Sequence, residues 1–188
     1  MRAIAVLGAL VVAATGVAVT GTSASAAPKC WTGKWKVTSA QAQIRADGLE
    51  FDLRGGKDIK LTLAKNGKAT YNFSGSKPLT GKGKVQGVPT QATLTLVKTL
   101  RMNNTITGSG KGKVTGKRKS ASGDAVLTVK AGLLTQRHSV AKAVRTGGDQ
   151  GVVPRAAQYT CTAKKLTIRQ TVKDGSGYSK TVWQLRRA

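Results

Sequence analysis

Apolar residues recur at every second position in several short stretches of the sequence, and this periodicity restricts most of the chain to β-strands. Between 59 and 63, Ile and Leu occupy the odd positions and polar residues the even ones; between 69 and 73, Ala, Tyr and Phe alternate in the same way. Such alternation gives a strand one buried and one exposed face. Asn66-Gly67 lies between the two stretches and predicts a tight hairpin turn, because both turn positions favour positive φ.

Further strands follow along the chain. The alternation returns at 93–96, 125–129 and 166–169, and a last hairpin is predicted at 174–177, with a return strand over 178–187. About eight to ten strands with short turns predict an all-β fold, an antiparallel up-and-down β-barrel. Only the stretch 132–146 departs from the pattern: its apolar residues lie near helical spacing, so a short helix and a further strand both stay open. The glycine-rich stretch 147–151 is predicted to be a surface loop.

The first residues have the pattern of an export signal. A positive start, Met1-Arg2, precedes an apolar run over 3–19, and Ala24-Ser25-Ala26 is the small-x-small pattern that signal peptidases accept. We therefore predict a signal peptide over 1–26, cleavage after Ala26, and a secreted, extracellular single domain over 27–188, with cell-wall association as a further option. The alternatives are an uncleaved membrane anchor and lipid attachment at Cys30.

Export determines how the two cysteines are interpreted. Cys30 and Cys161 lie near the two ends of the predicted mature chain. Outside the cytoplasm two lone cysteines most simply form one disulfide, which would tie the first strand to the last strands. Two unpaired, buried thiols are the alternative.

The charge of the chain points to anionic partners. There are 32 Lys and Arg against 7 Asp and Glu, a net charge of +25, so salt-sensitive attraction to polyanions is expected. The heptapeptide at 81–87 recurs at 110–116 with one change. We predict one exposed cationic patch made of Lys82, Lys84, Lys111, Lys113, Lys117, Arg118 and Lys119. The alternative is two similar strand or turn segments that carry solvated lysines.

The residues that commonly carry catalysis are few. His138 is the one histidine of the chain. The acids Asp47, Glu50, Asp52 and Asp58 cluster, but Arg45, Arg54 and Lys57 stand among them, which favours local salt bridges on a loop over a glycosidase pair or a calcium site. We predict a protein that is not an enzyme and that needs neither cofactor nor metal.

One motif near the predicted mature N-terminus resembles a known family. Gly33-Lys34-Trp35 is similar to the Gly-x-Trp signature of the lipocalin and calycin superfamily, and the chain also resembles secreted lipocalin-like proteins of actinobacteria. The resemblance implies an eight-stranded barrel that Trp35 closes at its base, with Arg187, or failing that Arg186, across the indole ring. It also implies a small apolar ligand inside the barrel.

Two classes of function follow. The first is a binding protein whose barrel holds a small apolar molecule, with Tyr71, Phe73 and Trp183 as candidates to line the site; plain core packing is the alternative for these three rings. The second is a polycationic extracellular protein that binds cell-wall polymers, anionic membranes or nucleic acid without sequence specificity. Sequence-specific nucleic-acid recognition is not expected, because no binding motif is present and aromatic residues are sparse. A monomer is expected.

Overall fold

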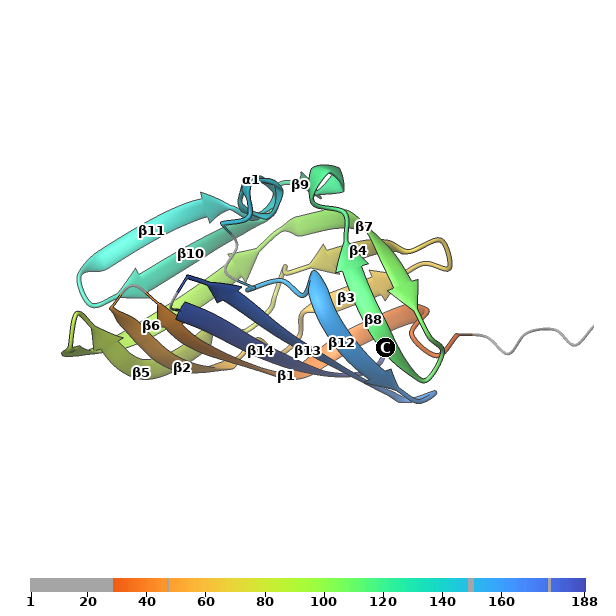
Figure 1. The fold of residues 1–188 in the computed structure, drawn as a ribbon, viewed down its shortest axis with the longest axis horizontal. Helices are drawn as coiled ribbons and strands as arrows, with labels where there is room; N and C mark the ends of the chain where they lie inside the picture. The colour runs from red at the N-terminus through yellow and green to blue at the C-terminus, as the bar shows by residue number, and fades with distance from the viewer. Residues whose placement is uncertain (1–28, 47, 149–150, 176) are drawn as a thin grey trace, which may run out of the picture.

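The chain folds into a single β-sheet that closes on itself, with one short α-helix against it (Figure 1). The computed structural model describes residues 29–46, 48–148, 151–175 and 177–188, so the predicted signal peptide lies outside the described residues. The predicted all-β antiparallel barrel is confirmed. No helix in the described part of the chain is both long enough and apolar enough to cross a membrane.

The elements follow one another in short steps along the chain. In order they are β1 (Gly33–Ala46), β2 (Leu49–Gly55), β3 (Lys60–Leu63), β4 (Lys68–Asn72), β5 (Leu79–Val85), β6 (Val88–Val97), β7 (Thr99–Thr107), β8 (Lys111–Gly116), a 3-10 turn (Arg118–Ser120), β9 (Ser122–Gly123), β10 (Val126–Ala131), β11 (Leu134–Ser139), α1 (Val140–Thr146), β12 (Ala156–Cys161), β13 (Lys165–Asp174) and β14 (Gly177–Arg187).

Eight of these strands close a barrel. Their order around the ring is β1-β14-β13-β12-β8-β7-β4-β3, and the pairing of β3 with the first residues of β1, Gly33–Lys36, completes the ring. Every pair in the ring is antiparallel. We call this part the closed barrel.

The later part of β1 belongs to a second group of strands. Residues 40–46 pair with β2, from which the sheet continues as β2-β5-β6-β10-β11. We call these five strands the wing; they lie together toward the left of Figure 1. β11 pairs only with β10 among the described strands, so it forms an edge of the wing.

The closed barrel and the wing share long, bent strand runs. β6 and β7 are separated by Lys98 alone, whose φ of 67° turns the chain from the wing into the closed barrel. β2 ends at Gly55 and the turn to β3 begins at Gly56; these two glycines have φ of 144° and 63°. A side chain at Gly55 would overlap the carbonyl oxygen of Pro78, so glycine is required there by both backbone and space.

The predicted hairpin around Asn66-Gly67 is present, although its turn differs from the two-residue form. The strands it joins end at Leu63 and begin at Lys68, and among the residues of this turn only Gly67 has positive φ (81°). The Asn66 side chain instead accepts a hydrogen bond from the Lys68 amide at 3.1 Å. The longer turn thus reverses the chain with one residue in the left-handed conformation, where a two-residue turn would need two.

The ambiguous stretch 132–146 contains both of the expected structures. Its first half forms β11 and its second half forms α1, whose N-cap Ser139 accepts a hydrogen bond from the Lys142 amide. Helix α1 buries Val140, Ala141 and Val144, and it ends at Gly147 in the left-handed conformation. The apolar spacing therefore reflected a short helix of seven residues, about two turns, placed against the sheet.

Candidate functional site

The base of the closed barrel carries the predicted contact between an arginine and a tryptophan. Trp35 is fully buried, and the Arg187 guanidinium lies 4.1 Å from the centre of its ring. Arg187 also donates hydrogen bonds to the carbonyls of Thr32, Cys30 and Ala163. Gly33 has a φ of 118°, a conformation that residues with side chains rarely adopt, and a side chain there would also meet the end of the guanidinium, which explains the glycine of the Gly-x-Trp motif here. The stack closes this end of the barrel.

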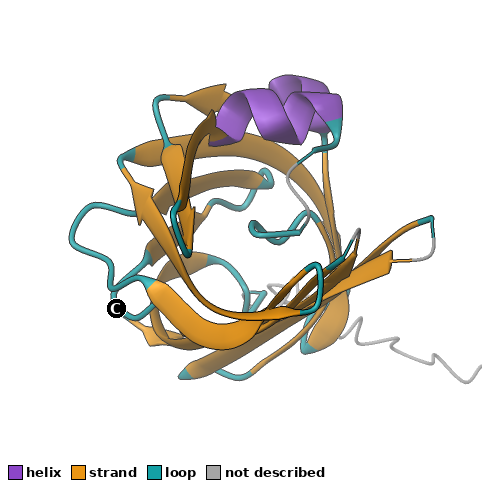
Figure 2. Ribbon diagram, turned by 90° about the vertical axis from the view of Figure 1, so that its left-hand side faces the viewer, coloured by secondary structure: helices purple, strands orange, loops and turns teal. Residues whose placement is uncertain are grey.

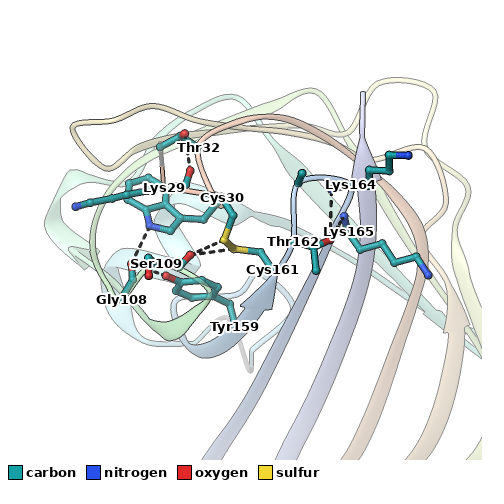
Figure 3. The surroundings of a disulfide bond; sticks show 12 residues. Lys29, Cys30, Thr32, Gly108, Ser109, Tyr159, Cys161, Thr162, Lys164 and Lys165 are labelled. Carbon is teal, nitrogen blue, oxygen red and sulfur yellow. Dashed lines mark hydrogen bonds between the residues drawn. A yellow bond between two sulfur atoms is a disulfide. The ribbon is translucent and has the colours of Figure 1, made fainter. Parts of the chain in front are cut away.

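The predicted disulfide joins Cys30 to Cys161 beside this base (Figure 3). Cys161 ends β12, and Cys30 lies three residues before β1 begins. Around the bond, the Trp31 indole donates to the Gly108 carbonyl at 3.3 Å and the Tyr159 hydroxyl donates to the same oxygen at 2.8 Å. A structural disulfide is typical of proteins outside the cytoplasm.

The three rings predicted to line a ligand site pack against one another inside the closed barrel. Tyr71, Phe73 and Trp183 are each at most 1% exposed. The ring centres of Tyr71 and Phe73 are 6.3 Å apart and stacked, and Trp183 meets Tyr71 edge to face at 6.1 Å. None of the three borders a described cavity. In this structure the rings form the barrel core, which was the alternative for them.

Tyr71 is expected to make the fold less stable as the pH rises into the alkaline range. Burial raises the pKa of its hydroxyl far above the ordinary value near 10, and the hydroxyl donates to the Pro154 carbonyl at 3.1 Å. Above about pH 10 the hydroxyl ionises in the unfolded chain but stays protonated in the folded one. The contribution of Tyr71 to the free energy of unfolding is therefore complete below about pH 10 and is lost as the pH rises above it. We expect Tyr71→Phe to reduce the fall of unfolding free energy above pH 10 by about 1.4 kcal/mol per pH unit. Urea unfolding of both proteins between pH 9 and 11 measures this, and identical slopes would contradict it.

A segment of the chain runs through the barrel interior. Residues 151–155, which we call the inner segment, follow α1, and Val153, Pro154 and Arg155 are buried. Figure 2 looks into the barrel from the wing end and shows loop inside the ring of strands. The predicted surface loop over 147–151 therefore ends inside the molecule: Gly151 is buried, while 149 and 150 lie outside the described residues.

Two polar side chains of the barrel wall hold the inner segment. The Gln170 side chain accepts from the backbone amides of Arg155 (2.8 Å) and Ala156 (2.7 Å) and donates to the carbonyls of Gly151 (3.1 Å) and Val153 (3.3 Å). Thr181, opposite Gln170 on the neighbouring strand, donates to the Gly151 carbonyl at 2.9 Å. These buried side chains supply partners that the irregular backbone needs inside a barrel.

A cavity of about 170 Å³ lies within the wing, and Val152 of the inner segment forms part of its lining. Its lining is mostly apolar and comes from β1, β2, β5, β6, β10, β11 and the inner segment. The lining residues are Ile44, Leu49, Phe51, Leu53, Val85, Ala92, Leu94, Val129, Ala131, Leu134, Gln136 and Val152. None of them was singled out from the sequence.

The cavity opens beside the hairpin between β10 and β11. Leu134 lines the cavity and is 59% exposed, and Leu133 at the hairpin tip is fully exposed. Gln136 contributes the one polar side chain of the lining, and its amide oxygen lies 3.2 Å from Nε2 of His138. The arrangement suits an apolar molecule that makes one hydrogen bond near the mouth.

The seven residues of the predicted cationic patch do not lie together. Lys82 and Lys84 are on β5, which pairs with β2 and β6, whereas Lys111 and Lys113 are on β8, which pairs with β7 and β12. Lys82 is opposite Gln91 and Lys113 opposite Thr107, at opposite ends of the β6–β7 run, with on the order of 50 Å of strand path between them. Lys117, Arg118 and Lys119 continue from the end of β8.

The acidic cluster forms local salt bridges, as predicted, but from strands and a turn rather than from one loop. Asp52 pairs with Arg45, and Asp58 pairs with Lys36, each at 2.8 Å. Asp47 lies outside the described residues. Within the described ranges, no three His, Cys, Asp or Glu side chains gather as a metal site would require. His138 is exposed on β11.

Comparisons with protein families, with curated proteins and with solved structures find no match to this chain.

Proposed function

We propose that this chain is a secreted, non-enzymatic, lipocalin-like protein that binds a small apolar molecule in the wing cavity. The observation that carries the proposal is the cavity itself: a hollow of about 170 Å³, lined by aliphatic side chains and Phe51, with one amide at Gln136. Pockets that bind small molecules have this composition, apolar walls with a few polar groups that fix orientation.

The volume of the cavity limits the size of the ligand. An engineered apolar cavity of about 150 Å³ in another protein stays dry and binds benzene. A hollow of about 170 Å³ therefore suits a single ring or a short aliphatic segment. Because Leu134 lies both in the lining and at the surface, a polar part of the ligand can extend outward through the mouth.

Other features support the lipocalin-like and secreted parts of the proposal. The stacking of Arg187 on the buried Trp35 is the arrangement that the Gly-x-Trp resemblance implies. The closed eight-strand barrel agrees with it. The Cys30–Cys161 disulfide, together with the predicted signal peptide, favours export.

Filling the cavity is expected to abolish binding of a neutral ring-sized probe. Ala131 is half-buried at the end of β10 and lines the cavity, so the phenyl ring of Ala131→Phe would occupy the space of the ligand. We expect toluene, titrated while methyl NMR signals of the wing are followed, to bind at least tenfold more weakly to this variant than to the native chain. Circular dichroism and thermal melting establish that the variant is folded.

The matched control is the same substitution on the outer surface. Ala156 is exposed on β12, so Ala156→Phe should leave toluene affinity unchanged. Equal affinity of the native chain and Ala131→Phe, with both folded, would mean that the cavity is not the binding site. Native mass spectrometry of the secreted protein identifies the natural ligand as a co-purified small molecule.

A further inference from the structure

Four cationic side chains form a straight row across the outside of the closed barrel. In the strand register Lys165 is opposite Arg186, Arg186 is opposite Lys36, and Lys36 is opposite Lys60. The row crosses β13, β14, β1 and β3, three of which lie side by side in Figure 1. Neighbouring strands are about 4.8 Å apart, so the row is roughly 14 Å long. We call these four residues the cationic row.

The strand alternation directs all four side chains to the solvent. The residue next to each of them is buried in the barrel: Leu166, Leu185, Trp35 and Leu61. Like charges that stand directly opposite one another in a sheet are unfavourable. The fold therefore places charges where they repel, and an anion laid along the row would relieve that repulsion.

Little negative charge in the described structure offsets the row. Asp58 pairs with Lys36 at 2.8 Å, and no described carboxylate forms an ion pair with Lys60, Lys165 or Arg186. Lys57 and Lys77 stand close enough to Asp58 to lower its pKa further, after the larger effect of Lys36. Lys36, Lys57, Asp58 and Arg186 also border a shallow hollow of the surface.

Beside the cationic row on β13 and β14, the next outward side chains are polar and uncharged, and the line continues onto β12 before it meets Lys111 on β8. Gln184 is opposite Thr167, and Thr167 is opposite Thr160, which is opposite Lys111. Two of these residues are threonines and one is a glutamine, which together donate and accept hydrogen bonds. On β13 and β14 the cations Lys165 and Arg186 therefore lie beside the hydroxyl of Thr167 and the amide of Gln184.

We propose that the cationic row is the binding site for a linear polyol-phosphate polymer, which lies across the four strands with its phosphates on the row and its hydroxyls against Thr167 and Gln184 beside the row on β13 and β14. Lys and Arg suit phosphate through charge and through the bidentate guanidinium. None of the four cations and none of the three polar residues beside them is aromatic, so these seven side chains offer no platform on which nucleic-acid bases could stack.

The two copies of the sequence repeat have different cross-strand neighbours. Lys82 and Lys84 are directly opposite Asp52 and Glu50 on β2, so each has an acidic cross-strand neighbour, although the ion pair of Asp52 is with Arg45. Lys111, by contrast, is opposite Thr160, and Lys113 is opposite Gln158, which is in turn opposite Arg169. Only the second copy adds to the cationic face.

The experiment compares two triple variants with the same change in net charge. Lys60→Gln/Lys165→Gln/Arg186→Gln removes most of the row, and Lys84→Gln/Lys130→Gln/Lys142→Gln removes three exposed lysines from β5, β10 and α1. Each is titrated with purified poly(glycerol phosphate) across a salt series. We expect the row variant to lose at least tenfold in affinity and about 2 in the slope of log K against log salt. The control variant should change less than threefold.

Two outcomes overturn the proposal. Equal losses in the two triple variants would mean that net charge, and not the row, attracts the polymer. A deoxythymidine oligonucleotide with the same number of phosphates is titrated in parallel. If it bound as tightly as the polyol phosphate and with the same dependence on the row, the partner would be a nucleic acid or any phosphodiester chain rather than the polymer proposed.

Discussion

Unfolding of the double variant Cys30→Ser/Cys161→Ser is expected to require about 4–5 kcal/mol less free energy than unfolding of the native chain. The bond spans a sequence separation of 131 residues, so it restricts the unfolded chain over most of its length. A loss of this size lowers the melting temperature of a domain of this length by roughly 10–20 °C. Thermal and urea unfolding of both proteins, followed by circular dichroism, measure the difference.

Reduction provides the control for this prediction. Dithiothreitol should destabilise the native chain by the same amount and leave the double variant unchanged. A loss of less than about 1 kcal/mol would mean that the unfolded chain without the bond is already compact enough for the cross-link to restrict it little.

The base of the barrel was predictable because its parts are encoded close to the ends of the chain. Gly33 and Trp35 form a recognisable pair, Arg187 lies on the terminal strand, and two cysteines leave one intramolecular pairing. The strand alternation likewise predicted the barrel, since it marks which face of each strand is buried.

The cavity was not predictable by the same reasoning. Alternation marks Leu53 and Tyr71 alike as buried, but it does not say which part of the barrel interior the chain itself fills. That depends on the path of the inner segment inside the barrel, which is determined by contacts with residues distant in the sequence, such as Gln170 and Thr181. The apolar run Val152-Val153-Pro154 after a glycine-rich stretch was the available signal, because a surface loop has no need of it.

The cationic row could not be predicted from the sequence for a different reason. Lys36, Lys60, Lys165 and Arg186 are distant in sequence, and only the register of four strands aligns them. The repeat at 81–87 and 110–116, by contrast, can be recognised from the sequence alone. Its two copies have different cross-strand partners, acids for the first and polar residues for the second.

Gln170→Leu is expected to lower the free energy of unfolding by about 3–5 kcal/mol. Gln170 is 4% exposed and makes four hydrogen bonds to the backbone around the inner segment. Leucine has a similar volume but offers no partner, and each buried backbone group left unpaired costs about 1–3 kcal/mol. Gly151 keeps its bond from Thr181, which limits the loss at that carbonyl. Urea unfolding measures the change.

The same substitution on the outside of the barrel is the matched control. Gln158 is exposed on β12, so Gln158→Leu should change stability by less than about 0.5 kcal/mol. Hydrogen exchange separates loss of the inner segment from loss of the whole fold. In Gln170→Leu the amides of Arg155 and Ala156 should exchange faster than those of β14, because only the former lose their acceptor. Equal stability of the two leucine variants would mean that packing of Val153 and Pro154, and not Gln170, keeps the inner segment inside the barrel.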